Sequence, residues 1–317
     1  MPSIYDVPAK LSPKFMPYIW GGTLLRDCLN KDIPSDDIGE SWEVSAHPKG
    51  QSTIATGPAK GMAFAEYAQG AEFYGSRTTG KFPLLIKLLG ATDNLSVQVH
   101  PGDHNCRPGE AGKAEAWYVL ACRPGAELIY GISGTAGEFA QAVKSGDMAG
   151  RLRRVAVRPG DVLDIPAGMV HALMAGVVVY EVQQNSDTTY RLYDWGRVDA
   201  VTGKPRELHV EAALSVIQEH RGMNPATGAS IQENGAVRTV CVTNRRFALE
   251  KLDITGRFTD PSHGSFAAYT VITGSGTVMK DGQPCFPLSL GESFVNPAAA
   301  GPVTIEGNIT LLKSYVP

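Results

Sequence analysis

The chain has 317 residues, of which 43% are hydrophobic, so it can bury one large core or two cores of ordinary size. Its formal net charge is -3 and its lysines and arginines form no block, which argues against a protein that binds nucleic acid or an anionic membrane. The five cysteines form no CxxC pair, so neither a disulfide framework nor a cysteine zinc site is expected. Without a secretory signal or an apolar run approaching about 18 residues, the chain is expected to be cytoplasmic.

Short candidate strands follow one another through the first two thirds of the chain. They are separated by glycine and proline, a spacing typical of a β-barrel or β-sandwich. Helical periodicity occurs in two places, "GEFAQAVKSGDM" and "RELHVEAALSVIQEH". The chain is therefore predicted to be mainly β. The expected strands are residues 82–89, 95–100, 115–121, 126–132, 154–166 and 176–184.

A stretch rich in glycine, asparagine and small polar residues follows the second helix. This stretch, "RGMNPATGASIQENGAVRT", is predicted to connect two units. We expect a catalytic unit at 1–220, a linker at 221–240 and a smaller β unit at 241–317.

A weak internal repeat supports two related units. "RPGDVLDIPAG" and "SLGESFVNPAA" share a glycine, an acid and a proline at equal spacing, and "EAWYVLACRPG" can be laid over "FAAYTVITGSG". The repeat places Phe266 where the first unit has Glu115, and Pro302 where it has His171. If the repeat is real, the second unit lacks this polar pair and is a metal-free structural partner.

The segment "NLSVQVHP" alternates between apolar and polar side chains. Because successive side chains of a strand point to opposite faces, Ser96, Gln98 and His100 share one face, while the leucine and valines share the other. A solvated sheet face explains this segment when it is taken alone, and a lined pocket is the alternative.

A second segment has glycines, a proline and a histidine at characteristic distances. The order Gly160, five residues, Pro166, one residue, Gly168, two residues, His171 resembles the second signature of the cupins, which are small jelly-roll barrels with an inward-facing histidine ligand. The glycines and the proline permit tight turns, so that His171 begins a strand. The asparagine that usually closes the signature is Ala175 here.

The first cupin signature supplies further ligands. Its positions correspond to Gln98, His100 and Glu115, which together with His171 offer two imidazoles, one carboxylate and one amide oxygen. This set would leave a divalent cation with a net charge of about +1, which suits an anionic intermediate. Iron oxygenases typically use two histidines and one carboxylate on one face, and the amide of Gln98 departs from that set. Zinc is therefore favoured over iron.

Five longer blocks give a more specific resemblance. "FPLLIKLLGATDNLSVQVHP", "GKAEAWYVL", "GDVLDIPAGMVHAL", "EVQQNSDTTYRLYDWGR" and "RELHVEAAL" occur in this order. Together they resemble the short form of the type I phosphomannose isomerases, members of the cupin superfamily that lack an inserted helical domain. The resemblance runs from residue 19 to about residue 217. It implies a cupin-type jelly roll followed by a smaller, metal-free cupin-like β domain.

The resemblance also implies an activity. It indicates an aldose-ketose isomerase that interconverts mannose 6-phosphate and fructose 6-phosphate, with one zinc ion per chain and a small sugar phosphate as its partner. The implied metal ligands are Gln98, His100, Glu115 and His171. The implied catalytic residues are Lys113 and Arg191, and the substrate pocket is lined by Ser96, Lys87, Lys113 and Arg191. Where longer relatives have a histidine before the lysine, this chain has Gly112.

The chemistry of an aldose-ketose isomerase agrees with these residues. Moving a carbonyl between C1 and C2 through an enediol needs a proton carrier and a group that stabilises oxyanion charge. Lys113 could carry the proton, although a solvated surface lysine or a zinc-bound water is an alternative. Lys87 could bind phosphate or could be a salt-bridged strand residue.

Several further residues are given structural interpretations. In "GESWEVS", a core Trp42 with surface acids at Glu40 and Glu43 is preferred over a border of the sugar site. No role is expected for His47, His104 or His209.

Rival functions stay open at this point. One is a cupin isomerase or epimerase that acts on another sugar phosphate, another is a non-catalytic sugar-binding regulatory cupin, and a third is an oxygenase. The sequence does not distinguish a monomer from a homodimer.

Overall fold

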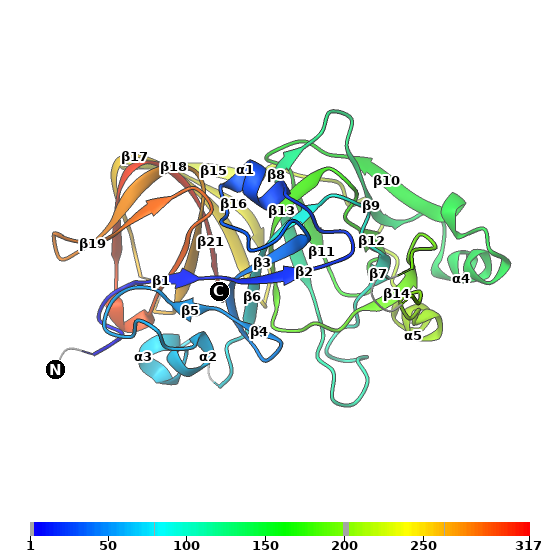
Figure 1. Cartoon of the computed structure of the whole chain (residues 1–317), viewed down its shortest axis with the longest axis horizontal. Helices are drawn as coiled ribbons and strands as arrows, with labels where there is room; N and C mark the ends of the chain where they lie inside the picture. Colours follow the sequence, from blue (N-terminus) through cyan, green and yellow to red (C-terminus); the bar gives the residue numbers. More distant parts are fainter. Residues whose placement is uncertain (1–2, 79, 199–202, 263) are drawn as a thin grey trace.

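The computed structural model describes residues 3–78, 80–198, 203–262 and 264–317. These residues form three sheets with short helices around them, so the prediction of a mainly β protein is confirmed. Figure 1 shows the C-terminal strands at one end of the molecule and strands β7, β9, β10, β12 and β14 at the other, with β3, β6, β8 and β13 between. No helix in the described ranges is long and apolar enough to cross a membrane.

Two sheets form the first barrel. The larger has the order β11-β8-β13-β6-β3-β2, with β4 paired to β3, and the smaller has the order β10-β9-β12-β7-β14. The strands of the larger sheet are β2 (Lys14–Pro17), β3 (Ile38–His47), β4 (Gly50–Gln51), β6 (Leu84–Ala91), β8 (Glu115–Cys122), β11 (Val162–Ile165) and β13 (Val177–Gln184). Those of the smaller sheet are β7 (Val97–Val99), β9 (Glu127–Ile132), β10 (Leu152–Ala156), β12 (His171–Ala172) and β14 (Tyr190–Tyr193).

The third sheet is dominated by the C-terminal part of the chain. Its order is β15-β16-β17-β21-β18-β20-β1-β5, with β19 paired to β18. Its strands are β1 (Ala9–Ser12), β5 (Thr53–Ile54), β15 (Ala229–Glu233), β16 (Ala236–Thr243), β17 (Ala248–Asp260), β18 (Ala267–Lys280), β19 (Gln283–Ser289), β20 (Ser293–Asn296) and β21 (Val303–Tyr315). The N-terminal strand β1 thus belongs to the C-terminal sheet.

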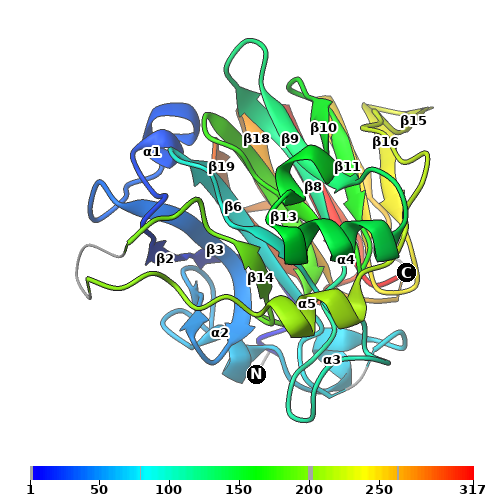
Figure 2. The same cartoon turned by 90° about the vertical axis from the view of Figure 1, so that its right-hand side faces the viewer.

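The helices are short and lie outside the sheets. They are α1 (Leu24–Leu29), α2 (Phe64–Tyr67), α3 (Gly70–Tyr74), α4 (Ala136–Ser145) and α5 (Val210–Val216), with 3-10 turns η1 (Met148–Arg151) and η2 (Ala298–Ala300). The two helices predicted from periodicity are α4 and α5, and both lie at the end of the molecule that carries β7, β12 and β14 (Figure 1, Figure 2). A capping box between Thr135 and Glu138 fixes the start of α4.

Two of the predicted elements differ from the structure. The strand expected at 154–166 is two strands, because a turn at Pro159 and Gly160 separates β10 from β11. Part of the predicted linker at 221–240 forms the hairpin β15–β16, whose turn contains Asn234 and Gly235. Asn-Gly is a strong signal for a two-residue hairpin, and the polar composition of the stretch obscured it.

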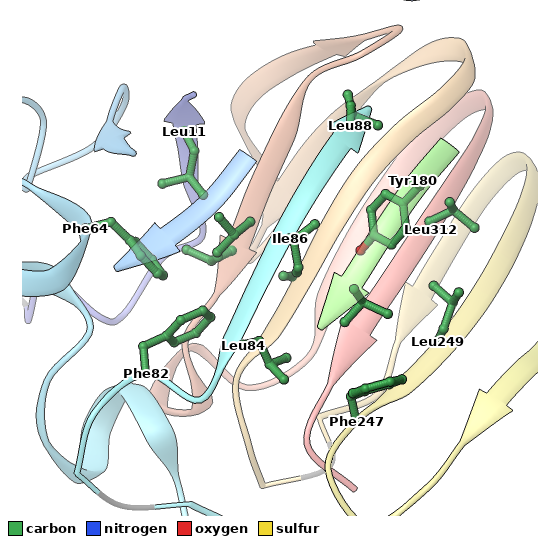
Figure 3. Close-up of a cluster of buried hydrophobic side chains, with 14 of the residues drawn as sticks. Leu11, Phe64, Phe82, Leu84, Ile86, Leu88, Tyr180, Phe247, Leu249 and Leu312 are labelled. Carbon is green, nitrogen blue, oxygen red and sulfur yellow. The ribbon is translucent and has the colours of Figure 1, made fainter. Parts of the chain in front are cut away.

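The central strand β6 separates an apolar core from the polar interior of the first barrel. Leu84, Ile86 and Leu88 point into a cluster that also contains Leu249 and Leu312 from the C-terminal sheet (Figure 3). Lys87 and Leu89, which alternate with them, face the opposite side, where they line a cavity. Because both faces are buried, the strand reads as an almost unbroken apolar run.

The strands of the internal repeat are antiparallel neighbours in both units, but their register differs by one residue. Val162 lies opposite Tyr118, so the repeat predicts Ser293 opposite Tyr269, whereas Ser293 lies opposite Thr270. A shift of one residue exchanges the two faces of a strand. Phe266 therefore packs in the apolar core between the sheets and not in the interior of the second barrel, so its predicted equivalence with Glu115 is wrong.

Candidate active site

Three buried side chains meet in the interior of the first barrel. The ligand atoms of His100, Glu115 and His171 all lie within 4.8 Å of one another. Nε2 of His171 is 3.1 Å from Oε1 of Glu115, and Nε2 of His100 is 3.4 Å from Oε2. His100 follows β7, Glu115 begins β8 and His171 begins β12, so each comes from a different strand.

Backbone carbonyls orient both imidazoles. Nδ1 of His171 lies 2.9 Å from the carbonyl oxygen of Met169, and Nδ1 of His100 lies 2.8 Å from that of Thr188. Each Nδ1–H donates to its carbonyl, which turns Nε2 toward Glu115. Burial, helped by the Lys113 ammonium, lowers the pKa of His100 to about 3, so this imidazole is neutral.

The turn before His171 requires a glycine. Gly168 has φ +87°, and a Cβ at this position would lie 2.9 Å from the carbonyl oxygen of Val216. Gln218 N also donates to the carbonyl of Gly168, which ties the end of α5 to this turn. The helix of the "RELHVEAAL" block therefore helps to place the histidine.

Gln98 lies next to the three buried groups. Its Cα is paired with that of His171, and its Nε2 is 3.4 Å from Nε2 of His171. Its Oε1 accepts a hydrogen bond from Ser96 at 3.4 Å. The structure thus brings all four predicted metal ligands together.

Lys113 faces the same carboxylate from the cavity side. Its Nζ donates to Oε2 of Glu115 at 2.5 Å and to Nε2 of His100 at 3.0 Å, and the residue is 5% exposed. It is therefore not a solvated surface lysine. Burial alone raises the pKa of Glu115, but the Lys113 ammonium, with smaller contributions from the two imidazoles, lowers it well below the usual range.

A cavity of about 300 Å³ opens above these groups. Every predicted substrate-lining residue is on its wall, namely Ser96, Lys87, Lys113 and Arg191. A larger cavity of about 890 Å³ adjoins it, and the two share Lys49, Asp187 and Thr189. Lys49 and Asp187 form an ion pair, so this pair lies on the boundary between the two cavities.

Lys87 is salt-bridged. Its Nζ lies 3.1 Å from Oε1 of Glu181 and 3.4 Å from Oε2 of Glu40, and it stands over the ring of Trp42. Burial on its own lowers the pKa of this lysine, but the carboxylates of Glu181 and Glu40 outweigh burial and raise it. Its charge is already neutralised within the wall.

Arg191 has the opposite environment. It pairs with Gln98 across the strands, its Nη1 donates to the carbonyl of Glu207 at 2.8 Å, and its buried Nε has no partner. In the described part of the chain it makes no ion pair with a carboxylate. Burial first and the Arg206 guanidinium second lower its pKa.

Two protein-family models and several known proteins match this chain. The family model "Phosphomannose isomerase type I, catalytic domain" matches residues 9–123, and "Mannose-6-phosphate isomerase, cupin domain" matches 238–316. Mannose-6-phosphate isomerase ManA of Bacillus subtilis is 36% identical over 98% of this chain and 99% of its own. This chain belongs to the type I phosphomannose isomerases. A mannose-6-phosphate isomerase of Streptococcus mutans is also 36% identical, over 97% of this chain and 98% of its own.

Solved phosphomannose isomerases have the same fold. The crystal structure of the Bacillus subtilis mannose 6-phosphate isomerase superposes with a TM-score of 0.90 at 39% identity, covering 97% of this chain and 99% of that one. A mannose 6-phosphate isomerase described as bound with zinc and yttrium superposes with a TM-score of 0.78 at 18% identity, covering 98% of this chain and 99% of the other. The cupin fold expected from the sequence is therefore confirmed.

Some residues of the phosphomannose isomerase cavity were missed or misplaced by the sequence analysis. Glu40 and Glu43, expected at the surface, are 7% and 1% exposed, because each neutralises a buried lysine, Lys87 and Lys31 respectively. Trp42, expected in the core, is buried but also lines the cavity. The further lining residues that were not predicted include Tyr18, Trp20, Trp117, Glu181 and Arg206.

The burial of one missed residue could have been predicted from the sequence. Glu181 is a single acid inside "VVVYEVQQ", a strand in which nearly every residue is buried. A charge in such a run needs a buried partner, which here is Lys87. The three histidines without an expected role also lie apart from the buried carboxylate of Glu115: His104 is exposed, His47 is 3.5 Å from Asp187, and His209 receives the backbone N–H of Arg191.

Proposed function

We propose that this protein is a zinc-dependent aldose-ketose isomerase that interconverts mannose 6-phosphate and fructose 6-phosphate through an enediol. Membership of the phosphomannose isomerase family and the names of relatives along the whole chain support the reaction. The observation that carries the proposal is the buried set His100, Glu115 and His171 beneath a cavity that Lys113 and Arg191 line.

The residues fit one divalent cation per chain. Two imidazoles hold their Nε2 atoms toward Glu115, and Oε1 of Glu115 is buried without a hydrogen-bond donor among the described residues. With Gln98 as the fourth ligand, neutral nitrogen and carboxylate donors suit zinc. A bound zinc ion would act as a Lewis acid on the substrate oxygens at C1 and C2. The zinc-bound relative supports the choice of metal.

Lys113 is the proposed proton carrier between C1 and C2. Its Nζ lies at the floor of the cavity, 2.5 Å from the carboxylate of Glu115, which is close enough to exchange a proton with a sugar held above the ligands. Glu115 and His100 fix the direction of the ammonium.

Arg191 is the proposed group that stabilises oxyanion charge. It is adjacent to Gln98 across the strands and has no carboxylate partner in the described ranges, so its positive charge is available to the enediol. Ser96 and Lys87 complete the proposed substrate-binding wall together with Lys113 and Arg191. Because Lys87 is held by two acids, its proposed role is to donate hydrogen bonds to sugar hydroxyls.

The test is a coupled assay with mannose 6-phosphate before and after chelation, with zinc added back. We expect activity to disappear with the metal and to return with zinc. Full activity after complete removal of metal would contradict the mechanism. A panel of aldose 6-phosphates in the same assay tests the substrate, and preference for a glucose or pentose phosphate would contradict the choice of mannose.

The role of Lys113 has its own test. Replacing it by Met should abolish exchange of the C2 proton of the substrate with solvent, while zinc content stays unchanged. Undiminished exchange would assign the proton to another carrier, such as a metal-bound water.

We also propose the division into a catalytic unit at 1–220, a connection at 221–240 and a second unit at 241–317. The separate family models for residues 9–123 and 238–316 support it. β1 crosses between the units, so the division describes barrels and not independent domains.

A further inference from the structure

The cations around the cavity differ in whether a carboxylate neutralises them. Lys87 pairs with Glu181 and Glu40, and Lys113 pairs with Glu115. Two guanidinium groups, those of Arg191 and Arg206, also line the cavity. A phosphate needs hydrogen-bond donors that are not already occupied, and the ammonium groups of Lys87 and Lys113 are held by carboxylates.

Arg206 shares its carboxylate with a second arginine. The buried carboxylate of Asp194 holds two guanidinium groups at once: it accepts from Nε of Arg206 at 2.8 Å and also from its Nη2, and from Nη2 of Arg197 at 2.6 Å. Arg197 lies 3.3 Å from Asp93 as well. Asp194 therefore offers one negative charge to two guanidinium groups.

Asp194 fixes the direction of Arg206. Asp194 occupies the fork of Nε and Nη2, whereas Nη1 donates to none of the described residues, and Arg206 lines the cavity. The side chain is 22% exposed, so it is held without being sealed from the cavity. A guanidinium fixed on one edge presents its other edge as a preformed donor.

The position of this cluster matches the length of a sugar phosphate. β14 runs antiparallel to β7, with Arg191 opposite Gln98 and Tyr193 opposite Val97, so Asp194 lies toward Ser96 and away from His100. From Gln98 to Ser96 the strand advances about 7 Å. If C1 and C2 of a sugar lie above the metal ligands, C6 therefore lies near Ser96 and Arg206.

We propose that Arg206, held by Asp194, binds the phosphate group of the substrate and determines the preference for a phosphorylated over a free sugar. This inference rests on the proposed function, since it assigns the phosphate end of the same substrate. Arg206 binds the phosphate, and Arg191, beside Gln98, lies near the reacting carbons.

The test compares Arg206→Gln with Arg158→Gln, which changes an exposed arginine, 79% accessible, outside the cavity lining. For Arg206→Gln we expect KM for mannose 6-phosphate to rise at least tenfold with a much smaller change in kcat, and the inhibition constant of inorganic phosphate to rise in parallel. The rate on unphosphorylated mannose should be unchanged. Arg158→Gln should match the wild type throughout.

Arg206→Lys is the control for a folding defect. It keeps the charge but loses the fork to Asp194, so we expect an intermediate KM, with wild-type zinc content and circular dichroism. An unchanged KM and phosphate inhibition constant in both Arg206 variants would overturn the inference, as would an equal loss on mannose and on mannose 6-phosphate. If free mannose is turned over too slowly to measure, the phosphate inhibition constants decide. A wild-type protein without activity on mannose 6-phosphate would instead contradict the proposed function.

Discussion

In the first barrel, the carboxylate of Glu115 faces two imidazoles and one ammonium. The interior of the second barrel instead contains an apolar cluster, to which β18 contributes Ala267, Tyr269 and Val271. Phe266 lies in the core between the sheets, where its ring is stacked 5.3 Å from that of Phe73 and lies 5.0 Å from that of Phe82.

The second barrel nevertheless contains buried charges. Arg238 donates to Glu233, Glu250 and Asp260, and Nζ of Lys313 lies 2.8 Å from Asp260. The carboxylates of Glu233, Glu250 and Asp260 thus surround the two cations, and Asp260 is shared between them. A cavity of about 10 Å³ beside Lys313 has room for little more than a water molecule.

The difference shows what separates a site from a scaffold. Both barrels bury acids and bases, and both leave buried polar atoms without a hydrogen-bond partner among the described residues: Oε1 of Glu115 and Nε of Arg191 in the first, Oγ of Ser265 and Oδ1 of Asn296 in the second. The first barrel has a cavity of about 300 Å³ at this place, whereas the cavity at Ser265 and Asn296 is about 10 Å³. An unpaired buried group costs stability unless a ligand completes it. Four changes test this comparison.

The largest effect is expected from His171→Ala. Loss of one imidazole should remove the metal and lower kcat/KM by more than about a hundredfold, since even partners of ligands contribute 10- to 100-fold. Bound zinc and the isomerase rate are measured together. His104→Ala, at an exposed histidine, is the control. Retention of one zinc ion and of near wild-type activity would contradict the ligand assignment.

Asp260→Ala in the second barrel should affect stability instead of activity. It leaves Lys313 and Arg238 buried with fewer partners, so the free energy of unfolding should fall by about 3–5 kcal/mol while kcat/KM of the folded protein is unchanged. Denaturant unfolding measures the first quantity. Asp281→Ala, at a side chain 86% exposed, is the control. Loss of activity in the folded variant would show that the second barrel contributes to catalysis.

As the pH falls, the first barrel should lose stability at a higher pH than the second. The neutral His100, with its pKa lowered to about 3 by burial, binds fewer protons when folded than when unfolded. Its stabilising contribution is therefore complete above about pH 6.5 and is lost as the pH falls, by about 1.4 kcal/mol per unit. Unfolding of the metal-free protein at pH 7.5, 6.5 and 5.5 measures this slope. A flat profile in this range would contradict a neutral His100.

The smallest effect is expected at the boundary between the two cavities. Lys49 and Asp187 form an ion pair, but the lysine side chain is 70% exposed. Lys49→Ala should lower the free energy of unfolding by less than about 1 kcal/mol and leave zinc content unchanged. A large loss of stability would mean that this pair is part of the core of the first barrel.

The sequence predicted the parts of the site that depend on local pattern. Alternation in "NLSVQVHP" placed Ser96, Gln98 and His100 on one face, and the spacing from Gly160 to His171 gave the turn that aims the second histidine. Gln98 and His171 lie opposite each other on paired strands, and Glu115 meets them from the other sheet of the barrel, an arrangement that no single segment reveals. The family resemblance supplied what local pattern could not.

The residues that were missed are those defined by a partner far along the chain. Glu40 and Glu181 are buried because both face Lys87 from neighbouring strands, and Arg206 lines the cavity because Asp194 holds it. An acid in a short polar motif is ordinarily exposed, so the sequence alone favoured the surface for Glu40. The hairpin β15–β16 was obscured by its polar composition in the same way.

The pairing of β1 with β20 has a consequence for how the chain is made. Ala9 pairs with Val295, so one of the first strands to be synthesised finds its partner among the last. β1 leads directly into β2 and Tyr18, and Met16 and Tyr18 line the cavity. Closing so long a loop is slow, and the cavity wall cannot be anchored during translation until β20 has emerged. A nascent or C-terminally truncated chain should therefore have no working active site, even though all the proposed catalytic residues have already been made.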